Sequence, residues 1–187
     1  MRPPEADRDR DVGGRPKNAR PRDGLGRPLD RGAAGEPVMP DDLRQDPGEA
    51  VLLAQRLIDE GRPFHAHEVL EAAWKSGPSE QRDLWQGLAQ IAVGLTHARR
   101  GNARGAVALL RRGAAAVDGF RARATMPGYL DPAGLDTAGL DTAGTAAGAT
   151  ELADRIAAHG LASLTDRDFC LRVTASAPPR DRDRDSG

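Results

Sequence analysis

SEQRDLWQGLAQIAVGLTHARR, residues 79–100, is the stretch that decides the fold of this 187-residue chain. Its apolar residues form two stripes at helical spacing. One stripe consists of Leu84, Leu88, Ile91 and Leu95, and the other of Trp85, Ala89 and Ala92. A helix that is apolar on more than one side packs in the centre of its bundle. The stretch therefore predicts an all-α fold, a small antiparallel helical bundle of about four to five helices with this helix at its centre.

Proline and glycine mark the helices that precede the central one. Pro47 suits the first turn of a helix and Gly61 its end, which predicts a first helix over residues 47–60. A second helix is predicted over residues 63–75.

The central helix has its own boundary signals. Ser79 is placed to cap its start, and the turn Gly101-Asn102 leads into a further helix that ends near residue 123. Gly87 and Gly94 lower helix propensity, so we expect them to permit the close approach of a neighbouring helix.

Composition divides the rest of the chain. Residues 1–46 are rich in Pro, Gly and balanced charge and lack apolar periodicity, which predicts a disordered leader before a bundle core at 47–124. Residues 125–149 contain the tandem GLDTAGLDTA and are predicted to be a low-complexity linker. A short helical extension at 150–174 and a disordered, charged tail at 175–187 are expected to follow.

Several classes of protein are excluded by composition. The formal net charge of −1 gives no overall attraction to nucleic acid or acidic membranes. Cys170 is the single cysteine, so neither an internal disulfide nor a zinc site of several thiolates can form. No stretch approaches the roughly 20 apolar residues that span a bilayer, and the first residues lack the apolar run of a secretory signal. We therefore expect a cytoplasmic protein.

The stretch FHAHEVLEAAW, residues 64–74, mixes ionisable and apolar side chains on the second predicted helix. At about 100° per residue one face collects the large aromatic residues together with two ionisable ones. This face consists of Phe64, His67, Leu70, Glu71 and Trp74. We expect it to point into the core, and His65 and Glu68 to lie on the other side.

The central helix carries a polar stripe that would face the same region. Leaving such groups buried and unpaired costs on the order of 1 to 3 kcal/mol each, so they need partners. We predict one interhelical polar cluster. Its members are His67, Glu71, Trp74, Gln86, Gln90 and His97.

Three interpretations of this cluster remain open. In the first, Glu71 accepts hydrogen bonds from His67 or Trp74, and the network fixes helix register. In the second, His67 and Glu71 hold a divalent metal ion, with Glu68, His65 or His97 completing the shell. In the third, His67 and Glu71 are catalytic residues in general acid/base chemistry. The absence of a clear third ligand favours the first interpretation over the second, and the absence of a nucleophile at recognisable spacing counts against the third.

FHAHEVLEAAW, followed by LWQGLAQIAVGLTHARRGNARGAVALLRRG, resembles the family catalogued as domain of unknown function 309. That family is recognised by a histidine, three residues, a glutamate, two residues and a tryptophan, here His67, Glu71 and Trp74. The resemblance covers about residues 49–120 and includes further matching positions. These are Gln86, Gly87, Leu88, Gly101 and Asn102.

The resemblance implies a small helical bundle and suggests that the histidine and glutamate bind metal. Many members read Glu-Ala-His-Glu where this chain reads His65-Ala66-His67-Glu68, which changes any outer shell. A metal-dependent, hydrolase-like enzyme is therefore one candidate function.

Protein interaction and nucleic-acid binding are the other two classes of function to consider. Residues 95–117 are similar to the helical hairpin of a tetratricopeptide repeat, so a protein-interaction module, either an adaptor or a homo-oligomer, is an alternative. Nucleic acid is disfavoured because Arg104, Arg111 and Asp118 share a solvated helix face, and no aromatic residue is interleaved to stack on bases.

Overall fold

The computed structural model describes residues 21–30, 32–35, 46–124 and 139–174. This part of the chain is all-α, as predicted, with no β-strand among its elements. The helices are α1 (Pro47–Asp59), α2 (Pro63–Ser76), α3 (Arg82–Arg99), α4 (Ala103–Ala124) and α5 (Thr142–His159), with short 3-10 turns η1 (Ser79–Gln81), η3 (Leu161–Ser163) and η4 (Asp166–Phe169). The predicted tail and the first GLDTA copy lie outside the described residues.

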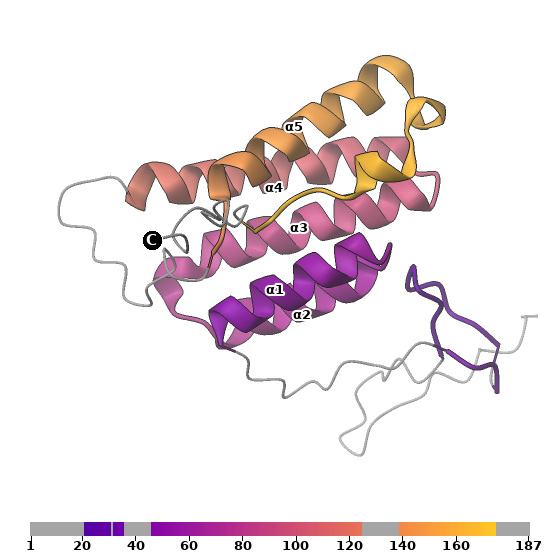
Figure 1. Ribbon diagram of the computed structural model, residues 1–187, viewed down its shortest axis with the longest axis horizontal. Helices are drawn as coiled ribbons and strands as arrows, with labels where there is room; N and C mark the ends of the chain where they lie inside the picture. Colours follow the sequence, from indigo (N-terminus) through magenta and orange to yellow (C-terminus); the bar gives the residue numbers. More distant parts are fainter. Residues whose placement is uncertain (1–20, 31, 36–45, 125–138, 175–187) are drawn as a thin grey trace, which may run out of the picture.

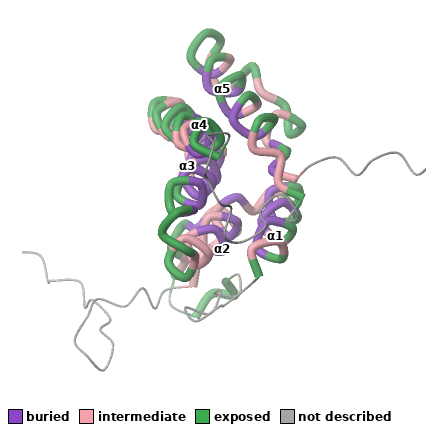
Figure 2. The backbone as a smooth tube through the Cα atoms, turned by 90° about the vertical axis from the view of Figure 1, so that its left-hand side faces the viewer, coloured by how far each residue is buried: buried purple, intermediate pink, exposed green. Residues whose placement is uncertain are grey.

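The five helices form an antiparallel array in which each packs against the next along the chain. Helix α3 packs on α2 and on α4, and α5 packs on the far side of α4 (Figure 1). The end view in Figure 2 shows buried residues on the sides where the helices face one another. The central place predicted for the helix within residues 79–100 is therefore confirmed, and its α-helical part is Arg82–Arg99.

Local signals explain where most helices begin. The Asp46 carboxylate accepts from the Gly48 N–H at 2.9 Å and caps α1, while Pro47 opens its first turn. Asn102 Oδ1 accepts from the Gly105 N–H at 2.9 Å at the start of α4. The predicted Ser79 cap is wrong, because residues 79–81 form the turn η1 and no side chain caps α3.

Glycines let α3 and α4 approach closely, as the sequence predicted for Gly87 and Gly94. A Cβ on Gly87 would lie 2.9 Å from the backbone oxygen of Gly113, and one on Gly94 would lie 2.8 Å from Leu110 Cγ. Gly113 on α4 is equally constrained, since its Cβ would lie 2.6 Å from the Gly87 oxygen. The crossing of α3 and α4 thus depends on glycine in both helices.

Helix α5 is longer than predicted and takes in part of the expected linker. It begins at Thr142, inside the second GLDTA copy, and Asp141 of that copy accepts from the Gly144 N–H at 2.7 Å. The alanine-rich residues that follow Asp141 pack on α4 and are partly buried. This burial stabilises a helix in a segment whose sequence is of low complexity. The linker boundary at 149 was therefore placed too late.

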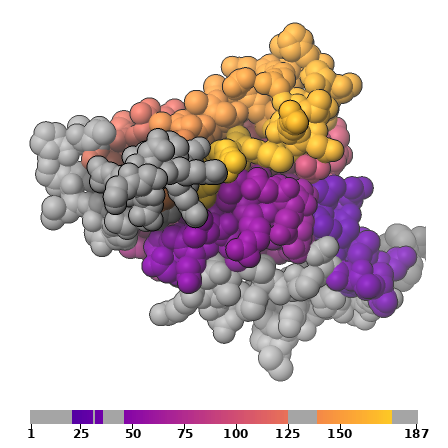
Figure 3. All heavy atoms as spheres, viewed as in Figure 1, coloured from indigo at the N-terminus to yellow at the C-terminus, as the bar shows by residue number. Residues whose placement is uncertain are grey.

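The residues after α5 close the bundle by returning across it to α1. Leu171 and Val173 are buried in the core. The Val173 N–H donates to Gln55 Oε1 of α1 at 2.7 Å, and Thr174 N–H donates to the same oxygen at 3.2 Å. Figure 3 shows this C-terminal segment, in yellow, on the surface between α5 and α1. The predicted extension at 150–174 is thus helical only in its first part.

Part of the predicted leader has a described structure. Residues 21–30 form a turn in which Arg22 and Pro28 make an isolated bridge. Gly26 is buried in this turn against the Phe64 ring at the start of α2. The rest of residues 1–45, apart from 32–35, lies outside the described part. None of the described helices is long and apolar enough to cross a bilayer.

Candidate functional site

The buried face of α2 is rotated from the one that the sequence predicted. The residues that point into the core are mostly small, Ala66, Val69 and Leu70 with Pro63 at the start. His67, Glu71 and Trp74 lie at the edge of this face and are half-buried. The prediction placed the aromatic residues inward, but the Phe64 ring is covered by the turn 21–30 instead of the core. The inward orientation of His67 and Glu71 is therefore corrected to an edge position.

His65 is the buried histidine of α2, opposite to the prediction. Its relative exposure is 3%, and its ring lies edge-on to Phe64 with centroids 5.6 Å apart. The position follows from the rotated face, since His65 lies next to Ala66 and one turn before Val69. A rim position for His65 was therefore wrong.

His67, Glu71 and Lys75 form a row of charged or chargeable groups along α2. His67 Nε2 lies 3.5 Å from Glu71 Oε2, and Lys75 Nζ lies 2.9 Å from the other carboxylate oxygen, Oε1. Spacing of i, i+4 places these groups one above another. The side chains of His67 and Glu71 are 24% and 35% exposed, so the pair is reachable from solvent yet partly desolvated.

The surroundings of His67 keep its imidazole neutral near pH 7. Burial lowers the pKa of His67 from 6.5 because it removes water from the charged form, Glu71 opposes this shift, and Lys75 adds to it. A neutral imidazole has a lone pair available to accept a proton or to bind a metal ion. The row can therefore act as a base or as a ligand pair.

The predicted hydrogen-bond network is only partly formed. Among the described residues, three members of the predicted cluster have a buried polar atom without a hydrogen-bond partner, namely His67 Nδ1, Trp74 Nε1 and Gln90 Oε1. Apart from the His67–Glu71 contact, the network of the first interpretation therefore lacks the bonds from Trp74 and Gln90. Unpaired buried polar atoms are costly and concentrate at sites that bind water, ions or ligands.

The other members of the predicted cluster lie elsewhere. Gln86 is exposed on α3, which removes it from the cluster. His97 Nδ1 is 2.7 Å from Asn102 Nδ2 and belongs to the α3–α4 turn. No group of three or more His, Cys, Asp or Glu side chains among the described residues is placed to hold a metal ion. The predicted shell that added Glu68, His65 or His97 to the pair is therefore not assembled.

Two buried glutamines were missed by the sequence analysis. Gln81 is fully buried, and its Oε1 accepts from the indole N–H of Trp85 at 3.0 Å. Gln55 holds the C-terminal segment, as described above. A signal for Gln55 was present, because it completes the i, i+3, i+4, i+7 pattern of Val51, Ala54 and Ile58 on the buried face of α1.

The turn 21–30 borders the candidate site through Phe64. The guanidinium groups of Arg22 and Arg100 lie 5.6 Å and 5.9 Å from the centroid of the Phe64 ring. Arg100 also donates to the carbonyl oxygen of Leu25. Phe64 in turn lies 6.2 Å from the ring of His67. The described piece of the leader thus packs on Phe64, whose ring is the neighbour of His67 on α2.

The fold and the site define a small all-α bundle with a half-buried His–Glu pair on its second helix. The sequence model of the family described as Domain of unknown function (DUF309) matches residues 51–109. The match runs over most of α1 through the start of α4, and the resemblance noted in the sequence is confirmed there.

Uncharacterized protein YpuF of Bacillus subtilis (strain 168) is 46% identical over 48 residues, which are 25% of this chain and 28% of the relative. The chain thus spans well under two thirds of that relative's length. No solved structure matches the chain significantly.

Proposed function

We propose that the bundle binds a divalent transition-metal ion through His67 Nε2 and Glu71 Oε2. The carrying observation is the 3.5 Å separation of these two atoms. Around a tetrahedral zinc ion with bonds of about 2.0 to 2.1 Å, two ligand atoms are about 3.4 Å apart. The two atoms are therefore already separated by about the distance between two ligands of one zinc ion, without a change of rotamer.

The neighbours of the pair support this role. The lowered pKa of His67, caused chiefly by burial, keeps the imidazole in the form that ligates metals. Lys75 occupies the other oxygen of Glu71 at 2.9 Å and leaves Oε2 free to bind. Nitrogen and carboxylate donors together suit zinc and related ions.

Two protein donors leave several coordination positions to water or to a substrate. Open positions are typical of catalytic metal sites, which usually have three protein ligands. Metal-assisted hydrolysis with His67 and Glu71 as the residues at the metal is accordingly the enzymatic form of this proposal. Binding of the ion is the step to test first.

The test is the binding of Zn²⁺ to the full chain, purified without a metal-affinity tag, by titration calorimetry. We expect one saturable site, lost in His67→Ala and in Glu71→Ala while helicity by circular dichroism is retained. His159→Ala, at an exposed position on α5, is the matched control and keeps the site.

Two outcomes would count against the metal proposal. The first is a wild-type protein that binds neither Zn²⁺, Co²⁺ nor Ni²⁺ saturably, with a large fall in melting temperature in both variants, which identifies the pair as purely structural. The second is undiminished binding in His67→Ala.

A protein-interaction module is the second candidate function. Leu52 on α1 is 58% exposed, a large apolar side chain at the surface of a helix that is otherwise well packed. Such a residue suits contact with a partner protein or a second copy of the chain. Sedimentation of the wild type and of Leu52→Glu tests this, since a self-associating wild type and a monomeric variant are expected.

We also propose a cytoplasmic location and no nucleic-acid partner. The exposed, free thiol of Cys170 supports a reducing environment. Arg111 on α4 is paired with Asp154 at 2.7 Å, and Arg123 with Asp83 at 2.6 Å, so part of the positive charge of this helix is already neutralised. Cell fractionation and a salt-dependent DNA-binding assay check the two statements.

A further inference from the structure

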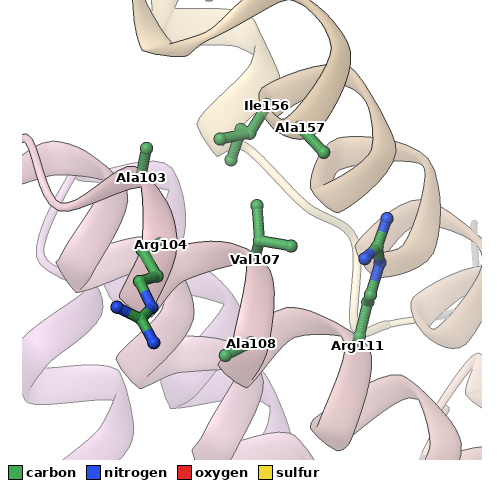
Figure 4. Close-up of a pocket in the computed structure, with 7 residues that line it drawn as sticks. All are labelled: Ala103, Arg104, Val107, Ala108, Arg111, Ile156 and Ala157. Carbon is green, nitrogen blue, oxygen red and sulfur yellow. The ribbon is translucent and has the colours of Figure 1, made fainter.

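A groove lies between the first half of α4 and the end of α5, on helices that the metal proposal does not use. Its volume is about 470 Å³. Figure 4 shows side chains of both helices lining it. The lining residues are Ala103, Arg104, Val107, Ala108, Arg111, Ile156 and Ala157. This size falls within the range of small-molecule sites, about 300 to 1,000 Å³.

The floor of the groove is apolar. Val107 of α4 points toward Ile156 and Ala157 of α5 (Figure 4). The other apolar positions are alanines, which leave space above the helix backbones. An aliphatic chain would bury apolar surface here without displacing a polar group.

One positive charge at the groove is left uncompensated. Arg111 reaches across to α5, where it pairs with Asp154 at 2.7 Å (Figure 4). Arg104, two helical turns away, is exposed and has no ion pair among the residues that the structure describes. The groove therefore combines an apolar floor with a single free guanidinium at its edge.

We propose that this groove binds an amphiphilic monocarboxylate, an aliphatic chain with one carboxylate head. The chain lies on Val107 and Ile156, and the carboxylate pairs with Arg104, whose planar guanidinium matches carboxylate geometry. The distance from Arg104 to Arg111 along α4, about 10 Å, sets the length of chain that the groove covers.

A small ligand fits the groove better than a partner protein. Stable protein interfaces bury about 800 Å² on each partner, from roughly 20 to 30 residues. The groove offers seven lining residues on two helices. Its volume of about 470 Å³ is that of a small-molecule site.

The test is titration of the full chain with decanoate below its micelle concentration, followed by calorimetry and by NMR shifts of the groove residues. We expect saturable binding with shifts at Val107 and Ala157. Arg104→Gln is expected to weaken it about fivefold, as loss of an exposed ion pair predicts. Arg112→Gln, an exposed arginine of α4 outside the groove, is the matched control and binds as the wild type does. Decanol, which lacks the charge, binds more weakly than decanoate and is insensitive to Arg104→Gln.

A second pair of variants separates the groove from the rest of the surface. Ala157→Glu places an anion in the groove and abolishes binding, whereas Ala158→Glu, also exposed on α5 but outside the lining, retains it. Equal melting temperatures of the two variants show that the fold is intact. The proposal is overturned if decanoate does not bind saturably, if decanol binds as tightly, or if the two glutamate variants bind alike. None of these outcomes depends on the metal site on α2.

Discussion

At the scale of single residues, the ionisation of His67 depends on its burial and on two charged neighbours on the same helix. Burial lowers its pKa, and the two charged neighbours on α2 act in opposite directions. Glu71 stabilises the imidazolium, and Lys75 destabilises it. The three residues stand at i, i+4 spacing, and Glu71 lies between the two others, 3.5 Å from His67 and 2.9 Å from Lys75.

The neighbours of His67 should shift its titration in opposite senses. Lys75→Gln removes a positive charge and is expected to raise the pKa of His67, while Glu71→Gln removes the negative charge that favours the imidazolium and is expected to lower that pKa further. Titration of the His67 ring protons by NMR measures both. A rise on Glu71→Gln would show that the carboxylate does not act on the imidazole through its charge.

The lowered pKa also predicts how stability depends on pH. Unfolding returns the pKa of His67 to about 6.5, so below that pH the unfolded chain binds a proton more readily than the folded one. The contribution of neutral His67 is therefore fully present above about pH 6.5 and is lost as the pH falls. Melting temperatures from pH 5 to 8 should decline less steeply on the acid side for His67→Asn than for the wild type. Parallel curves would contradict the assignment.

At the scale of elements, the crossing of α3 and α4 rests on glycine. A Cβ at Gly113 would meet the Gly87 carbonyl at 2.6 Å and Ile91 Cγ1 at 2.7 Å. Neither a backbone oxygen nor a buried isoleucine can move away without separating the helices. The short distance between α3 and α4 is thus a property of these positions.

Two glycine substitutions in α4 should have opposite effects. Gly113→Ala overpacks the crossing and is expected to destabilise the protein by about 1 to 3 kcal/mol. Gly119→Ala meets nothing closer than Arg123 Nη1 at 3.7 Å, and helix propensity should stabilise it by up to about 1 kcal/mol. Urea unfolding of both variants measures the difference. Similar free energies would show that the helices can part at little cost.

At the scale of the whole molecule, Gln55 joins the first helix to a segment more than a hundred residues later. Its Oε1 accepts from the N–H groups of Val173 and Thr174, and its Nε2 donates to the Leu171 carbonyl at 3.4 Å. These bonds satisfy the backbone of a segment that enters the core without secondary structure of its own. Gln55 therefore anchors the α1 side of this closure, while on the α5 side the Asp141 N–H donates to the Val173 carbonyl at 3.0 Å.

Removing this side chain should loosen the closure. Gln55→Leu keeps most of the volume but leaves two amide groups unpaired, at an expected loss of about 1 to 3 kcal/mol in the free energy of unfolding. Hydrogen exchange at Val173 should accelerate in the same variant. Gln86→Leu, at an exposed position, is the control and should change stability by less than about 0.5 kcal/mol. An unchanged Val173 exchange rate would show that other contacts hold the segment.

Short-range signals account for the parts of the fold and the site that the sequence could predict. Pro47, Gly61 and the Gly101-Asn102 turn delimit helices through backbone conformation and caps, which involve only neighbouring residues. The two apolar stripes placed α3 at the centre, and the spacing of His67 and Glu71 placed them together on α2. The start of α5 was predicted too late, because the second GLDTA copy was assigned to a low-complexity linker although its Asp141 caps the helix.

What the sequence determined by itself is therefore an all-α chain, the bounds of α1, α2 and α4 to within a residue or so, the central place of α3 and the pairing of His67 with Glu71. Only the tertiary structure decided which face of α2 is buried. Apolar residues surround that helix, so its periodicity is compatible with more than one orientation, and the close fit of Ala66 and Val69 against neighbouring helices selects among them. The return of residues 171–174 to Gln55 was likewise a tertiary choice, because that contact joins positions whose proximity exists only once the helices between them have packed.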